Sequence, residues 1–149
     1  MISVMIADGS MAERLAALSN ACFAQPWSSR SFQSEFAKGS VVLLARADSV
    51  DVGFAVMERS FDEGYISNVA VISDARRQGV GRMLVRRLIG FAQAEKLSRI
   101  LLEVRVSNAA AIELYSSEGF CTIARRREFY ERPREDAYTM ELILKGESH

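Results

Sequence analysis

The chain has 149 residues, 49% of them apolar, which suits one well-packed domain but not two ordinary ones, so we expect a single domain over residues 1–149. Its 19 basic and 19 acidic side chains balance, which argues against general nucleic-acid binding because that function favours a basic excess. No apolar run approaches the roughly 20 residues that cross a bilayer, and residues 1–6 lack the features of a signal peptide, so we expect a cytoplasmic protein with no membrane partner.

The sequence predicts both strands and helices along its whole length, and we find no internal repeat, low-complexity tract or linker. A capping box at Ser10 and Glu13 predicts the start of the first helix, and Pro26 separates it from a short helix with Phe32 and Phe36 on one face. In chain order we expect a strand over residues 2–7, a helix over 10–22, the short helix, strands over 41–47, 52–59 and 65–71, a helix over 79–95, a strand over 100–104, a helix over 109–118, and strands over 120–126 and 137–144. This order predicts an α+β domain, a mixed sheet with helices on both faces.

The segment between the strand at 65–71 and the next helix carries the most informative pattern, Arg76-Arg77-Gln78-Gly79-Val80-Gly81. A helix start offers unpaired N–H groups and the positive end of a dipole, and Gly79 and Gly81 let the backbone close on a phosphate. We therefore expect a ligand that carries pyrophosphate. The pattern fits neither ATP nor NAD. A Walker motif needs Lys and then Ser or Thr directly after its last glycine, but Arg82 and Met83 follow Gly81. The dinucleotide motif needs a third glycine where this chain has Leu84. A tight turn without a ligand is the alternative.

Glu103 interrupts a strand that is otherwise made of Ile, Leu and Val, the composition typical of a strand buried on both faces. A buried carboxylate is costly unless it has a partner or a function. We interpret Glu103 as a general base that acts through a water molecule. The alternatives are an ion pair with Arg105 on the same face of the strand, or an exposed strand end.

Asn108 and Tyr115 lie seven residues apart, two helical turns, so both project from one face of the helix that Asn108 caps. We expect the Tyr115 hydroxyl to donate a proton to a leaving group and Asn108 to bind an amide of the ligand. An ordinary N-cap and a core tyrosine form the alternative. Val69-Ala70-Val71 lead directly into the glycine segment, so their backbone is placed to bind the extended arm of the same ligand, and a bulge there would free an N–H to polarise a carbonyl.

The rarest side chains limit the possible chemistry. His149 is the only histidine and the last residue, which excludes a histidine-based triad or metal site, so we expect no metal. Cys22 and Cys121 lack metal-type spacing and are expected to be buried, reduced thiols. We expect the Arg125-Arg126-Arg127 run at a solvated strand end, and Trp27 as a packed aromatic, with a place in a substrate groove as its alternative.

With these residues in place, nearly the whole chain resembles the GNAT family of N-acetyltransferases. Arg76-Arg77-Gln78-Gly79-Val80-Gly81 matches the family's acetyl-CoA pyrophosphate signature, Gln/Arg-x-x-Gly-x-Gly/Ala. Phe23-Ala24-Gln25-Pro26-Trp27-Ser28 and Leu102-Glu103-Val104-Arg105-Val106-Ser107-Asn108 are similar to the RimI type, the ribosomal-protein-alanine N-acetyltransferases. The resemblance implies the family's three-layer fold, with a mostly antiparallel sheet of about seven strands between helices.

The resemblance also implies a role for each matching residue. Glu103 would accept a proton, Tyr115 would donate one, and acetyl-CoA would be the cosubstrate of the reaction. The cofactor-binding residues would be Val69, Ala70, Val71, Arg76, Arg77, Gln78, Gly79, Val80, Gly81, Arg82 and Asn108. The acceptor would be the N-terminal peptide of a ribosomal protein, although Phe129 stands where the type more often has the first of two tyrosines. Another protein N-terminus, a small-molecule amine, or a non-catalytic CoA-sensing module are the alternatives.

Overall fold

The computed structural model describes residues 1–144, and its elements follow the predicted order. They are β1 (Ile2–Ile6), the 3-10 turn η1 (Gly9–Met11), α1 (Ala12–Cys22), α2 (Ser29–Lys38), β2 (Val41–Ala47), β3 (Val50–Ser60), β4 (Glu63–Val71), η2 (Ser73–Ala75), α3 (Val80–Ala94), β5 (Arg99–Arg105), α4 (Ala109–Ser117), β6 (Cys121–Glu131) and β7 (Arg134–Ile143). Within the described residues, no helix is both long and apolar enough to span a membrane.

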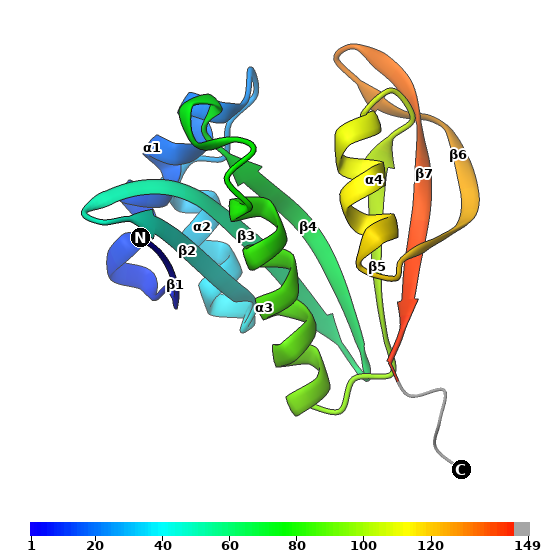
Figure 1. Ribbon diagram of the computed structural model, residues 1–149, viewed down its shortest axis with the longest axis horizontal. Coiled ribbons are helices and arrows are strands. Elements are labelled where there is room, and N and C mark those ends of the chain that lie inside the picture. Colours follow the sequence, from blue (N-terminus) through cyan, green and yellow to red (C-terminus); the bar gives the residue numbers. More distant parts are fainter. Residues whose placement is uncertain (145–149) are drawn as a thin grey trace.

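The seven strands form one sheet in the order β1-β2-β3-β4-β5-β7-β6. All neighbours are antiparallel except β4 and β5, which run parallel because α3 carries the chain back between them. Figure 1 shows α3 and α4 on the near face of the sheet and α1 and α2 behind it. This arrangement confirms the predicted α+β fold with helices on both faces.

Two apolar clusters hold the layers together. The larger one lies under α3 and α4, where Leu84 and Leu88 are fully buried against strand residues such as Ile100. The smaller one lies on the other face, where Phe32 of α2 packs edge-on against Phe54 of β3. Because α1 and α2 lie mainly over β2, β3 and β4, the second face of β5, β7 and β6 is left to side chains of the strands themselves.

The parallel contact between β4 and β5 is short. It runs from Glu63 opposite Arg99 to Ile66 opposite Leu102, and beyond these residues the two strands are not paired. Figure 1 shows them diverging toward the end of the sheet where the loop after β4 and the start of α4 lie. Ser67 is an extra residue in β4, since Val56 pairs with Asn68 and the next residue of β3 pairs with Ile66. A bulge therefore stands where the strands part, just before Val69.

Three local predictions were wrong. Ser10 is not the cap of a long first helix, because Asp8 caps the short η1 turn with its side chain and α1 begins only at Ala12, with no side-chain cap. β5 is not buried on both faces: Ile100, Leu102 and Val104 are buried and the residues between them are partly exposed. The closing strand β6 is also longer than predicted and almost wholly exposed, because it forms an edge of the sheet.

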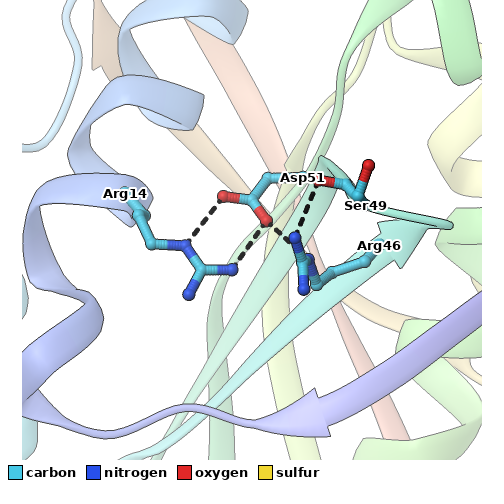
Figure 2. Close-up of polar contacts among 4 residues, drawn as sticks. All are labelled: Arg14, Arg46, Ser49 and Asp51. Atoms are coloured by element: carbon cyan, nitrogen blue, oxygen red, sulfur yellow. Dashed lines mark hydrogen bonds and ion pairs between the residues drawn. The ribbon is translucent and has the colours of Figure 1, made fainter.

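Asp51 ties the first helix to the hairpin between β2 and β3 (Figure 2). Its two carboxylate oxygens accept hydrogen bonds from Arg14 of α1, at 3.1 and 2.9 Å, and one of them also accepts from Arg46 at 3.0 Å. Arg46 in turn donates to the Ser49 carbonyl at the hairpin turn, at 2.7 Å. The hydrogen bonds from Arg14, more than any other cause, lower the pKa of the Asp51 carboxyl below its usual value. The network fixes α1 against one end of the sheet.

Candidate functional site

The glycine loop, residues 76–82, joins η2 to α3 and holds its shape through its backbone. Gly79 is the N-cap of α3 with φ +81°, a left-handed conformation that side chains disfavour, and no side chain caps the helix. A Cβ built on Gly79 would meet no atom within 4 Å, so conformation rather than crowding calls for glycine there. The first N–H groups of α3 are therefore without side-chain partners, as the sequence predicted for an anion site.

A cleft of about 880 Å³ opens beside this loop, between the end of β4 and helix α4. Ten of the eleven predicted cofactor-binding residues line it: Val69, Ala70, Val71, Arg76, Arg77, Gly79, Val80, Gly81, Arg82 and Asn108. Gln78 does not, because its side chain turns back to donate to the Asp74 carbonyl at 3.3 Å. Residues distant in sequence thus line one cleft, which includes the side chains of Arg76, Arg77 and Arg82.

Asn108 and Tyr115 reach the cleft from α4. Asn108 is also the predicted N-cap, since its side-chain oxygen accepts from the Ala111 N–H at 3.1 Å. That bond uses one lone pair of the oxygen and leaves both amide N–H groups of Asn108 available to a ligand. Tyr115 is 8% exposed and packs edge-on against Phe120, and burial raises the pKa of its hydroxyl to about 12. Both the structural and the functional interpretation of this pair are thus compatible with the fold.

Glu103 lies on the opposite face of the sheet from α4. Its neighbours Leu102 and Val104 point into the core under the helices, so the Glu103 side chain points to the face that no helix covers. There its side chain is only 8% exposed, and one oxygen accepts from the Tyr65 hydroxyl. The other oxygen accepts from Thr139 at 3.1 Å. Glu103 is therefore neither a solvated strand end nor part of the cleft.

The alternative interpretation of Glu103, an ion pair with Arg105, is wrong. Arg105 shares the face of Glu103 but turns toward the β6–β7 hairpin, where it pairs with Glu135 at 3.1 Å and stacks on the ring of Tyr130 at 4.2 Å from the centroid. The nearest guanidinium to Glu103 belongs to Arg126, at 3.6 Å. Part of the arginine run thus faces the candidate base, although Arg125 pairs with Asp136 at 2.8 Å on the exposed edge strand.

The two groups of site residues lie on opposite faces of the sheet, near the place where the pairing of β4 and β5 ends. The cleft with Tyr115 lies on the helix-covered side, and Glu103 lies on the other side, beside the last paired residues of the two strands. A ligand that extends along Val69 toward the Ser67 bulge would end between these groups. An acceptor that comes from the open face would reach the same point from the side of Glu103.

Sequence reasoning missed Tyr65 and Thr139, the two hydroxyl donors to Glu103. Their strands are distant along the chain, and only the sheet order places β4 and β7 on either side of β5. With the sheet order known, the alternation of side chains along each strand identifies both residues. Thr139 pairs directly with Glu103, and Tyr65 pairs with Leu101, whose side chain lies on the same face as Glu103.

The remaining expectations have mixed outcomes. Trp27 is a packed aromatic, with its ring 5.3 Å from that of Phe32, so the packed interpretation is confirmed. Both cysteines are free thiols, but neither is fully buried: Cys22 is partly exposed at the edge of the cleft and Cys121 is exposed on β6. Burial raises the pKa of the Cys22 thiol, while nearby Arg76 opposes the shift.

Comparisons with known proteins agree with this geometry. Residues 12–120 match the model described as the acetyltransferase (GNAT) family. The [ribosomal protein bS18]-alanine N-acetyltransferase of Salmonella typhimurium is 39% identical over 121 residues, which cover 80% of this chain and 82% of that protein. The N-alpha-acetyltransferase RimI of Mycobacterium tuberculosis is 34% identical over 120 residues, covering 77% and 74% of the two chains.

Solved structures agree as well. The crystal structure of the ribosomal-protein-S18-alanine N-acetyltransferase from Escherichia coli superposes on this chain with a TM-score of 0.91 and 32% identity. The superposition covers 100% of this chain and 99% of that one, so the resemblance is not confined to the cleft. From the cleft, the fold and these relatives, we conclude that this chain belongs to the acetyltransferase (GNAT) family.

Proposed function

We propose that this acetyltransferase moves the acetyl group of acetyl-CoA to the α-amine of an N-terminal alanine on a ribosomal protein. Two relatives support this proposal: one, 39% identical, is named a [ribosomal protein bS18]-alanine N-acetyltransferase, and the other, 34% identical, an N-alpha-acetyltransferase RimI. The reaction would take place in the cytoplasm, with residues 1–149 acting as one domain. The observation that carries the proposal is the cleft, which unites ten predicted cofactor-binding residues with Tyr115.

The cleft suits an elongated anionic thioester. Its basic end holds Arg76, Arg77 and the open N-terminus of α3, which attract and hydrogen-bond a pyrophosphate. The backbone of residues 69–71 would bind the extended pantetheine arm, and the Asn108 amide would donate to one of its carbonyls. The bulge at Ser67 is placed to turn a backbone N–H toward the thioester carbonyl, where negative charge develops during the transfer.

The acceptor amine must be neutral to attack, and this requirement favours an α-amine over a lysine. An α-amino group has a pKa near 7.8 and a lysine near 10.4, so at pH 7.5 roughly a third of the former is neutral against about 0.1% of the latter. The difference, about 300-fold, corresponds to roughly 3.4 kcal/mol. Glu103, held on the open face beside the gap, would take the proton that the nitrogen releases as it bonds to the acetyl carbon.

Tyr115 would act on the leaving group, the CoA sulfur, as the carbon–sulfur bond breaks. Its pKa of about 12 keeps the hydroxyl protonated at neutral pH. A thiol has a pKa near 8.5, so complete transfer of the Tyr115 proton to the departing thiolate would be uphill by roughly 5 kcal/mol. Tyr115 would therefore act mainly as a hydrogen-bond donor that stabilises the charge on sulfur as the bond breaks.

An acetyl-CoA assay against N-terminal peptides that begin with Ala, Ser, Met and Gly tests the proposal. We expect the alanine peptide to have the highest kcat/KM, and a peptide with the same sequence but a blocked N-terminus and one lysine to be inactive. Preference for a different first residue or for a small amine would favour the alternative, another acceptor for the same chemistry. Absence of thiol release with every amine would favour a CoA-binding module without catalysis.

A further inference from the structure

One of the two hydroxyl groups that donate to Glu103 belongs to Tyr65, a residue that has no role in the proposed function. The Tyr65 hydroxyl of β4 donates to one carboxylate oxygen of Glu103 on β5. Tyr65 is paired with Leu101, one register before the strands part, so it lies at the inner end of the gap. Its ring is half-buried, and it does not line the cofactor cleft.

The carboxylate of Glu103 is held from two sides. Tyr65 occupies one oxygen and Thr139 of β7 the other, at 3.1 Å, with the Arg126 guanidinium 3.6 Å away. A glutamate side chain has several rotamers, and two donors on strands either side of β5 select one of them. Of the two hydroxyl donors, only Tyr65 is on the strand that also forms the cleft and the bulge.

The environment of Tyr65 keeps its hydroxyl protonated, so that it can donate a hydrogen bond to Glu103. Burial, followed by its hydrogen bond to Glu103, raises the pKa of the phenol above its ordinary value. The hydroxyl therefore stays protonated throughout the physiological range, and its hydrogen is directed at the carboxylate. The phenol oxygen keeps lone pairs on the side away from that bond.

We propose that Tyr65 is a positioning residue for acetyl transfer, which aims the Glu103 carboxylate at the acceptor amine across the gap between β4 and β5. The role rests on the function proposed above. Tyr65 and the residues that would bind the thioester arm all belong to β4. This one strand would therefore position both the acetyl donor and the general base.

The test removes the hydroxyl and keeps the ring. We expect Tyr65→Phe to lower kcat about 10- to 100-fold, the effect of losing one hydrogen bond to a charged group, while KM for acetyl-CoA changes less than about twofold. Tyr138→Phe is the matched control, because Tyr138 lies on neighbouring β7 and, paired with Val104, points to the other face. It should retain kcat.

A double-mutant cycle separates positioning from a general effect on the fold. If Tyr65 acts through Glu103, adding Tyr65→Phe to Glu103→Gln should lower kcat by less than about twofold further. Equal losses in both backgrounds would overturn the proposal, as would wild-type kcat in Tyr65→Phe alone. A loss shared with Tyr138→Phe and matched by a lower melting temperature would also overturn it.

The same experiment distinguishes the inference from the proposed function. Wild-type protein that prefers an amine other than an N-terminal alanine contradicts the proposed acceptor, and the cycle is then run with the preferred amine. Wild-type activity that survives Glu103→Gln contradicts the assigned base and with it the role of Tyr65. Normal Tyr65→Phe beside an inactive Glu103→Gln contradicts the inference alone.

Discussion

The glycine loop and the surroundings of Glu103 are assembled in different ways. The loop takes its shape from seven consecutive residues and presents backbone N–H groups, with Gly79 in a left-handed conformation at the start of α3. Glu103 is held by side chains from β4, β6 and β7 that are 23 to 38 residues away along the chain. One half of the site is local, and the other exists only once the sheet has formed.

Because the two parts are built differently, substitutions in each should change a different kinetic parameter. A change in the loop alters a backbone that binds a ligand, so it should affect affinity for the cofactor. A change around Glu103 alters the aim of one carboxylate, so it should affect turnover. The variants below test this division, beginning with the largest expected effect.

Glu103→Gln should be the most damaging single change. The amide has nearly the same shape but cannot accept the proton of the amine, and we expect kcat to fall about 10²- to 10⁴-fold with KM for acetyl-CoA little changed. Steady-state kinetics with the best peptide measures both parameters. Glu13→Gln, an exposed carboxylate in the first turn of α1, is the control. Wild-type turnover in Glu103→Gln would remove Glu103 from the mechanism.

Tyr115→Phe should cost less, about 10- to 100-fold in kcat, because it removes one hydrogen bond to developing charge. The pH profile gives a sharper test. Since the pKa of Tyr115 is raised to about 12, the donor form persists as pH rises, and wild-type kcat should show no loss between pH 8.5 and 10.5. If kcat instead fell around pH 10 while circular dichroism showed the protein still folded, the Tyr115 hydroxyl would have the pKa of an ordinary phenol.

Gly79→Val should raise KM for acetyl-CoA about 5- to 30-fold while kcat stays within a factor of about two. A β-branched residue is costly at φ +81°, by roughly 1–2 kcal/mol, and the loop would shift to relieve the strain. Gly79→Asn is the matched variant, because asparagine tolerates the left-handed region and a Cβ there meets open space. If both variants bind acetyl-CoA equally well, the conformation of Gly79 does not matter for binding.

Asp51→Asn should have the smallest effect and none on kinetics. Losing the charge that Arg14 and Arg46 share should lower the free energy of unfolding by about 1 kcal/mol, measured by urea denaturation at pH 7. Because the folded-state pKa of Asp51 is lowered, its contribution is complete above the unfolded-state value near 3.9 and is lost as pH falls below it. The gap between variant and wild type should therefore close in acid. A constant gap down to pH 2.5 would exclude this carboxylate as its source.

Much of the fold follows from local patterns, because hydrophobic period and turn residues are local properties. Asn108 caps α4 as predicted, and the order of all seven strands and four helices is confirmed. The errors also have local causes: Asp8 competed with Ser10 for the start of the first helix, and an apolar run hid the alternation of β5. Ten of the eleven residues predicted to bind a cofactor line the cleft, because all but Asn108 lie in two short segments of the chain, whereas Cys22 and Phe23 of its lining were not predicted as site residues.

The surroundings of Glu103 were not predictable in the same way. Arg105 is its neighbour in sequence on the same face, yet the hairpin carboxylate Glu135 takes that cation. Tyr65 becomes its partner because α3 crosses over and makes β4 and β5 parallel neighbours, and Thr139 because β7 pairs with the other edge of β5. Both pairings are long-range, and no short pattern specifies them. The roles of Glu103 and Tyr115 in catalysis stay predictions until the variants are measured.

The short parallel contact between β4 and β5 has a consequence for the thermal stability of the protein. β1 to β4 form one half of the sheet, and β5, β7 and β6 form the other. Within residues 1–144, the four paired positions of β4 and β5 are the only strand-to-strand contact between the two halves. A cosubstrate bound in the cleft between the end of β4 and α4 would contact both halves where their strands are no longer paired. Binding to the folded state alone would add roughly 2.7 kcal/mol of stability at a hundred times its Kd. A cell depleted of acetyl-CoA would then hold this enzyme in its most heat-labile form.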